Sequence, residues 1–182
     1  MPQPGAVERE LIHTRQILCQ GFKRRDGLWD IEAELTDVRT YGVDNEYRGR
    51  IEAGEPVHRM RLRVTLDIEF TIHDVEAESE SVPAAACKTV TTGMKRLIGL
   101  KIRKGWMKQV HERVGGTRGC THLIELLGPI GTTAYQTMYR EVEEHARTLP
   151  ERRKPRVIDS CVTWASGGEK VKRYWPEYYT GA

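Results

Sequence analysis

Hydrophobic and polar residues alternate along two stretches in the first half of the chain. In residues 28–38 (LWDIEAELTDV), the apolar positions are Trp29, Ile31, Ala33 and Leu35. In residues 57–66 (VHRMRLRVTL), the matching positions are His58, Met60, Leu62, Val64 and Leu66. A period of two is typical of a β-strand with one buried face. The other positions are mainly acidic in the first stretch and mainly basic in the second, so we expect the two strands to pair, with cross-strand ion pairs on the outer face.

Two further strands complete the predicted sheet. The segment LDIEF (66–70) predicts a tight reversal, and FTIHDVEA (70–77) returns as a strand. The apolar phase of this strand slips between Ile72 and Val75, which predicts a β-bulge there. The segment LIHTRQILCQGF (11–22) is the other predicted strand. We therefore expect an antiparallel sheet within a sheet-rich segment at residues 10–80.

The second half of the chain has helical periodicity. A first helix is predicted to begin at Pro83, because proline is favoured at a first helical position; its apolar face holds Cys87, Val90, Thr91, Met94 and Ile98. A second helix, WMKQVHERV (106–114), ends at the glycine pair 115–116. A third helix starts between Thr117 and Thr121 and continues past Gly128-Pro129 to residue 149. Its apolar stripe holds Tyr135, Met138, Tyr139, Val142 and Ala146.

These elements predict an α+β fold, in which an antiparallel sheet is packed by about three helices and a C-terminal hairpin follows. The hairpin is expected around Gly167-Gly168. The chain has 182 residues, which is the size of one domain. We therefore expect a single domain at 1–182, with a helical segment at 83–149 and a C-terminal extension at 150–182.

Composition and charge exclude several classes of protein. The net charge is +3, and the basic runs at 94–108 and 147–156 lack the aromatic and glycine pattern of a nucleic-acid-binding module, so no nucleic-acid partner is expected. No window has the roughly 18 apolar residues that a membrane span needs, so no membrane partner is expected. The N-terminus lacks the apolar region of a secretory signal, which predicts a cytoplasmic protein. The four cysteines (Cys19, Cys87, Cys120 and Cys161) contain no CxxC pair and are expected to be thiols.

The stretch GCTHLIELL (119–127) is the first candidate for chemistry. Cys120 lies at the start of a predicted helix, where free N–H groups and the helix dipole stabilise a thiolate. Cys120 also shares a face with Ile124 and Leu127, so a buried core cysteine is an equally physical reading. His122 and Glu125 are three residues apart on another face, where the carboxylate can orient the imidazole. The pair predicts either an acid–base unit, half a metal site, or an exposed histidine with a helical neighbour.

His58 is the second candidate, because it opens the apolar face of its strand at the rim of the sheet. Flat apolar side chains that suit a phenolic ring are Trp29, Trp106, Tyr135 and Tyr139, and the alternative is that they belong to the core. Arg61 or Arg63 can hold an oxyanion if a pocket forms, and Asp30 is a further substrate-binding candidate. The sequence contains no GxGxxG, Walker loop, HExxH or GxSxG motif, which leaves proton-transfer chemistry as the feasible class.

The chain resembles two known families. GLWDIEAEL, the HxMxLR pattern at 58–63, GCTHLIELL and IDSC together resemble an uncharacterised bacterial family, "domain of unknown function twenty-eight eighty-nine". That resemblance covers nearly the whole chain and implies an association with the bacterial catabolism of aromatic compounds. A weaker, fold-level resemblance is to NifU-type iron–sulfur scaffolds. It implies that Cys87, Cys120, Cys161 and His122 gather to bind zinc or an iron–sulfur cluster.

Three hypotheses follow. The first is a small enzyme without a cofactor, a lyase or isomerase acting on a small aromatic, lignin-derived compound, for example by releasing a hydroxymethyl group as formaldehyde. Its proton carriers are His58 and His122, with Glu125 as orienter, Arg61 as anion stabiliser and Tyr135 as a phenol contact. The second is the metal or cluster scaffold of Cys87, Cys120, Cys161 and His122. The third is an interaction module whose amphipathic helices meet a partner or form a homo-oligomer.

Overall fold

Four strands form one antiparallel sheet in the order β1-β2-β5-β6. In the computed structural model, which describes residues 7–149 and 154–181, these strands are β1 (His13–Lys23), β2 (Trp29–Arg39), β5 (Pro56–Leu66) and β6 (Ile72–Ser81). All four predicted strands are therefore confirmed. Between β2 and β5, the short strands β3 (Val43–Asn45) and β4 (Gly49–Ile51) pair with each other and were not predicted.

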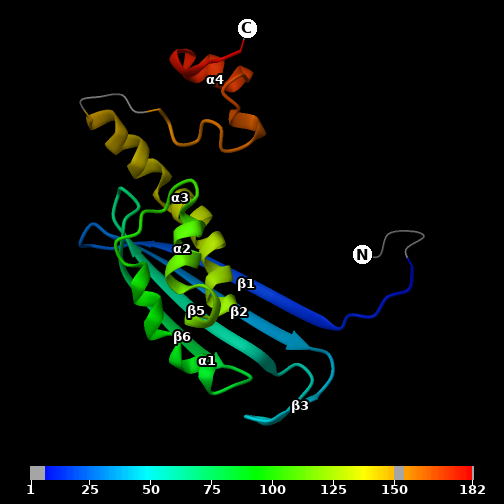
Figure 1. The fold of residues 1–182 in the computed structure, drawn as a ribbon. Coiled ribbons are helices and arrows are strands. Elements are labelled where there is room, and N and C mark those ends of the chain that lie inside the picture. Colours follow the sequence, from blue (N-terminus) through cyan, green and yellow to red (C-terminus); the bar gives the residue numbers. More distant parts are fainter. Residues whose placement is uncertain (1–6, 150–153, 182) are drawn as a thin grey trace. The chain divides into compact units, whose positions relative to one another are not determined.

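The two faces of the sheet differ as the alternation predicts. The buried face carries the apolar residues of β2 and β5, and α2 (Trp106–Val114) and the first part of α3 (Thr121–Thr148) lie over this face (Figure 1). On the outer face, Arg61 Nε donates to a Glu34 carboxylate oxygen at 2.7 Å, and Arg63 pairs with Glu76. The predicted cross-strand charge pairs are confirmed.

Bulges mark both ends of β5. The pairing of β5 with β6 shifts between Thr65 and Leu66, because Thr65 faces Asp74 whereas Leu66 faces Ile72. The predicted bulge between Ile72 and Val75 is therefore confirmed. At the other end, the pairing of β2 with β5 shifts between Asp37 and Val38. Bulges re-aim nearby side chains and are frequent beside functional sites.

The predicted continuous helix from Pro83 to Ile98 is wrong. The structure has a single turn, α1 (Ala86–Thr89), and then a separate 3-10 helix, η1 (Thr92–Leu97). The stretch from Thr89 to Thr92, at the junction of the two, consists of β-branched residues and is followed by Gly93, and all of these have low helix propensity. The hydroxyls of Thr89 and Thr91 also bond carbonyls three residues back, which competes with the helical pattern. As a result Leu97 is buried and Ile98 is exposed.

The other two predicted helices of this segment are confirmed. The helix α2 ends at Gly115, and the short η2 (Gly116–Arg118) leads to Gly119. The carbonyl of Cys120 accepts the first hydrogen bond of α3, from the Ile124 N–H at 3.0 Å, so Cys120 is the N-cap residue. The helix then runs through Pro129 without a break.

The structure divides into two compact units, Met1–Glu141 and Val142–Ala182, with the division inside α3. Within the second unit, residues 154–181 form η3 (Val162–Trp164), α4 (Glu169–Tyr174) and η4 (Pro176–Tyr178). The predicted hairpin around Gly167-Gly168 is wrong. The carbonyl of Gly168 accepts from the Lys172 N–H at 3.1 Å, so this glycine caps a helix instead of turning a hairpin. None of the described helices is long and apolar enough to cross a membrane.

Gly21 sets how closely α3 approaches β1, which gives a first prediction. A Cβ at Gly21 would lie 1.8 Å from the Thr137 hydroxyl oxygen of α3. We expect Gly21→Ala to lower the free energy of unfolding by about 1–3 kcal/mol, the usual range for overpacking. Chemical denaturation with circular dichroism measures this. Adding Thr137→Ala should restore part of the loss. Gly128→Ala, whose Cβ meets nothing within 4 Å, should be neutral or stabilising. Equal stabilities of Gly21→Ala and the wild type would contradict the packing.

Candidate functional site

Asp37 is a buried carboxylate on the apolar face of the sheet. It lies two positions beyond Leu35 on β2, so the alternation that buries Leu35 also buries Asp37, which is 2% exposed. In the pairing of β2 with β5, Asp37 lies directly opposite His58. A buried charge is stable only when it is paired and hydrogen-bonded. The partners of Asp37 therefore define the site.

Two residues of β1 bind Asp37 from one side. Arg15 donates to both carboxylate oxygens, from Nε to Oδ1 at 2.8 Å and from Nη2 to Oδ2 at 2.7 Å, and His13 Nε2 lies 3.1 Å from Oδ1. Burial alone raises the pKa of Asp37, but the hydrogen bonds and charge of Arg15 outweigh it, so the pKa is lowered overall. Asp37 is therefore ionised at neutral pH.

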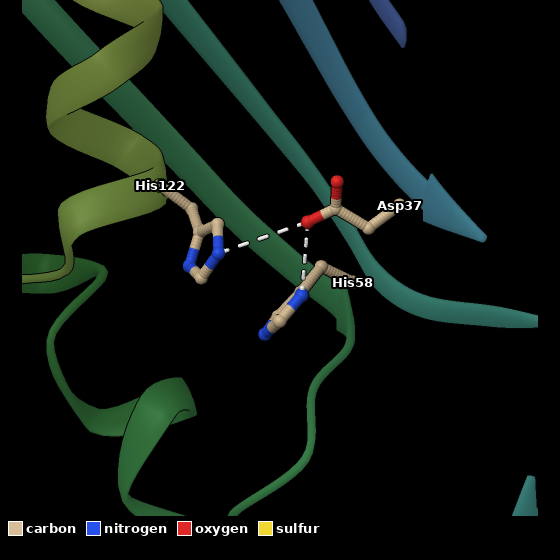
Figure 2. Close-up of side chains that lie close together, drawn as sticks. All are labelled: Asp37, His58 and His122. Atoms are coloured by element: carbon tan, nitrogen blue, oxygen red, sulfur yellow. Dashed lines mark hydrogen bonds and ion pairs between the residues drawn. The ribbon is translucent and has the colours of Figure 1, made fainter. Parts of the chain in front are cut away.

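Two histidines approach Asp37 from the other side, one from β5 and one from α3 (Figure 2). His58 Nδ1 donates to Asp37 Oδ2 at 3.0 Å, and His122 Nε2 lies 3.7 Å from the same oxygen. The two imidazole rings lie face to face, with centroids 3.9 Å apart and planes tilted by 31°. We call Asp37, His58 and His122 the His–His–Asp centre.

Both imidazoles of the centre are held in the neutral form. Burial lowers the pKa of His58, and the positive charge that His122 would carry lowers it further. Burial also lowers the pKa of His122, with a further lowering by the charge of Arg15. Asp37 acts in the opposite direction on both histidines without overcoming these effects. The centre therefore has one carboxylate and two neutral rings at pH 7.

Cys120 is a core residue that also touches the centre. Its side chain is packed in the core, with Sγ 3.9 Å from Met60 Sδ, and the residue is 9% exposed. Its Sγ also lies 3.8 Å from His122 Nδ1. Cys120 therefore contacts the second nitrogen of a ring whose first nitrogen points at Asp37.

Glu125 contacts the centre through a different residue from the one predicted. We expected it to orient His122, and in the structure it accepts a hydrogen bond from Arg15 Nη1. Arg15 thus joins β1 to α3 as well as to β2. Glu125 influences His122 only through its charge, which acts to raise the pKa of that histidine.

The other predicted substrate-binding residues lie away from the centre. Arg61 is on the outer face of the sheet, paired with Glu34. Asp30 accepts a hydrogen bond from Thr65 Oγ1 at 2.6 Å. Its neighbour Trp29 is eight positions from Asp37 on the same strand, which is about 26 Å. Tyr135 stacks on Phe70 and is 13 positions from His122, about 20 Å along a helix, while Trp106 packs against Gly131. The structure does not bring these aromatic side chains to the two histidines.

The residues able to share a metal ion are those of the centre itself. Among residues 7–149 and 154–181, Asp37, His58 and His122 form the one group of three or more His, Cys, Asp or Glu side chains whose ligand atoms all lie within 4.8 Å of one another. Cys87, which is half-buried beside η1, is not in that group, and Cys161 is an exposed residue of the second unit. The predicted ligand set of three cysteines and His122 therefore has no support from geometry. His122 is instead grouped with Asp37 and His58.

The sequence analysis did not predict three residues of the site, which are Asp37, Arg15 and His13. For Asp37 and Arg15, the alternation along the strands could have indicated their positions. Asp37 continues the buried parity of Trp29, Ile31, Ala33 and Leu35, so the pattern puts a carboxylate on an apolar face. Arg15 shares the face of Ile17, and the register of β1 with β2 sets it opposite Asp37. A charged residue on the apolar face of a strand indicates a buried ion pair.

Together, the fold and the site define a one-sided α+β domain with a buried histidine–histidine–aspartate centre at one end of its sheet. The chain belongs to the family described as "Protein of unknown function (DUF2889)", whose model matches residues 13–136. The matched segment contains β1 to β6 and the first half of α3, and so it includes the whole centre. No curated protein and no solved structure matches the chain significantly. The expected likeness to NifU-type scaffolds is therefore not shown.

The lowered histidine pKa values predict how stability depends on pH. Unfolded histidines titrate near 6.5, and His58 and His122 titrate lower in the folded protein, so below about pH 6.5 the unfolded state binds more protons. The free energy of unfolding should fall as the pH drops from 6.5, by at most about 1.4 kcal/mol per pH unit for each histidine. Urea titrations at pH 5.5 to 8 in EDTA measure this. The slope should be smaller in His122→Gln, and an unchanged slope would contradict the assignment.

Proposed function

We propose that the chain is a small enzyme that acts on an aromatic compound by acid–base chemistry, without an organic cofactor. The observation that carries the proposal is the hydrogen bond from His58 Nδ1 to the ionised Asp37. A carboxylate that binds one ring nitrogen fixes the tautomer and leaves the lone pair of the other nitrogen available as a base. Here that nitrogen is His58 Nε2, on a side chain that is 16% exposed.

His122 supplies the second group that such chemistry needs. Its ring lies 3.9 Å from the His58 ring and its side chain is 21% exposed, so both rings reach the same part of the surface. Once one ring has taken a proton from the substrate, the pair consists of an imidazolium acid and a neutral base, and groups this close can act on neighbouring atoms of one small substrate. The stacked rings also repel a second proton, so one imidazole takes a proton while the other remains neutral.

A reaction that needs only these groups is the loss of a hydroxymethyl group as formaldehyde. His58 Nε2 takes the proton of the hydroxyl group, the carbon–carbon bond breaks, and the C–O bond becomes the carbonyl of formaldehyde. The electron pair of the broken bond stays on the carbon attached to the aromatic system, and the proton that His58 has just taken completes the product, which returns His58 to its neutral form. The equation balances without an oxidant or reductant. The aromatic class of the substrate rests on the family resemblance described above.

The test is formaldehyde release from a panel of hydroxymethyl-bearing phenolic compounds, with and without EDTA. We expect release that EDTA does not abolish. His58→Gln keeps a donor for Asp37 but removes the base, and should lower kcat/KM by about 100-fold or more. The matched control is His73→Gln, which removes a histidine from an exposed pair with Asp67 and should leave activity unchanged. Equal activity in His58→Gln and wild type, or no release and no ligand-induced stabilisation across the panel, would refute the proposal.

A further inference from the structure

The three ligand atoms of the His–His–Asp centre have the spacing of donors around one metal ion. With zinc–nitrogen and zinc–oxygen bonds of about 2.0–2.2 Å, ligand atoms at tetrahedral angles lie about 3.3–3.6 Å apart. The separations from Asp37 Oδ2 are 3.0 Å to His58 Nδ1 and 3.7 Å to His122 Nε2, which lie on either side of that range. The three ligand atoms all lie within 4.8 Å of one another, so rotations of the two ring side chains can bring both nitrogens and the oxygen around one ion.

We propose that the centre binds one Zn²⁺ ion through Asp37 Oδ2, His58 Nδ1 and His122 Nε2, with the fourth position open to water. Two imidazoles and one carboxylate form a ligand set typical of zinc sites that keep an open position. The proposal goes beyond the proposed function, because it adds a ligand that the acid–base reaction does not use.

The protons of the two rings permit this binding. The cation takes the place of the proton that His58 Nδ1 now donates to Asp37, and the ring keeps its single proton by moving it through solvent to Nε2. His122 binds through Nε2 and holds its proton on Nδ1, which lies 3.8 Å from Cys120 Sγ. A metal-bound histidine usually donates its other ring N–H to a neighbouring acceptor, and Cys120 occupies that place.

The net charge of the residues around Asp37 can accommodate a cation. Arg15 pairs with Asp37 and Glu125, so the three residues together carry one negative charge before any metal binds. Arg15 keeps its hydrogen bond to Asp37 Oδ1, where the metal does not bind, and so continues to orient the carboxylate, whereas its second hydrogen bond, to Oδ2, shares that oxygen with the metal.

Zinc binding and the acid–base reaction require opposite tautomers of His58, because the zinc-bound ring carries its proton on Nε2, the nitrogen that acts as the base. A bound ion removes the His58–Asp37 hydrogen bond that fixes the tautomer of His58, and it takes up His122. We therefore expect zinc to inhibit the enzyme, and this consequence rests on the proposed function. Zinc binding itself does not.

The test is a calorimetric titration of chelator-stripped protein with zinc chloride at pH 7.5. We expect one site that is weakened about 100-fold or more in His58→Gln and in His122→Gln, because losing even a residue that supports a ligand costs about 10–100-fold in metal affinity. His73→Gln is the matched control, and Cys120→Ser tests whether the thiol is a ligand; both should bind zinc like the wild type. The proposal would be overturned if the wild type did not bind zinc, or if His58→Gln and His122→Gln both bound zinc as tightly as the wild type.

A second test uses only the wild-type protein and so does not require that the variants fold. It measures the nitrogen NMR resonances of the histidine rings as zinc is added. Ring nitrogen resonances of His58 and His122 should shift on zinc addition, at Nδ1 and Nε2 respectively, while those of His73 should not. Shifts confined to other histidines would overturn the site. Zinc binding at these nitrogens in a protein that releases no formaldehyde with or without zinc would support the metal site and refute the acid–base enzyme, so the two proposals fail separately.

Discussion

The charge of Asp37 is the constraint around which this end of the domain is arranged. A carboxylate on the apolar face of a sheet must be compensated, and Asp37 obtains its partners from β1 and β5, with a third group from α3 nearby. Arg15 then ties the N-terminal part of α3 to the sheet through Glu125. Breaking a buried ion pair by removing one partner is strongly destabilising. The network therefore fixes the relative positions of three strands and a helix and at the same time brings the two imidazoles together.

The same network gives the centre its chemical properties. Burial and the Arg15 charge keep both rings neutral, and Asp37 remains ionised beside them. A neutral imidazole held by a carboxylate is at once a general base and a metal ligand, so the same geometry supports both proposals. What separates them is the occupant of His58 Nδ1, which is a proton in the acid–base form and a cation in the metal-bound form. The exposed pair of His73 and Asp67 has the same residue types but, among the residues that the structure describes, belongs to no group of three metal-binding side chains, which makes it the natural comparison.

The sequence predicted the sheet well because alternation reports burial directly, as in Trp29 to Leu35. It failed where local preferences competed, as at the threonine-rich end of α1, and where a glycine pair fitted two structures, as at Gly167-Gly168, which was expected to turn a hairpin and instead precedes α4. The candidate histidines were found because each stood beside an apolar pattern, but their shared partner was not. Asp37 and His58 are 21 residues apart in the chain, and only the register of β2 with β5 places them opposite each other. The aromatic side chains were misplaced for a related reason, because composition identifies them as a class but does not say at which end of the sheet they lie.

The chemistry of the centre depends on the ionised Asp37 holding His58 as the neutral ring protonated on Nδ1. The most direct measurement is the long-range proton–nitrogen correlation spectrum of the histidine rings of the full chain at pH 7 in EDTA, with the His58 resonances assigned by substitution. We expect a neutral His58 with its proton on Nδ1, and in Asp37→Asn the tautomer should become mixed or reverse. A His58 protonated on Nε2 alone, or on both nitrogens at pH 7, would contradict it.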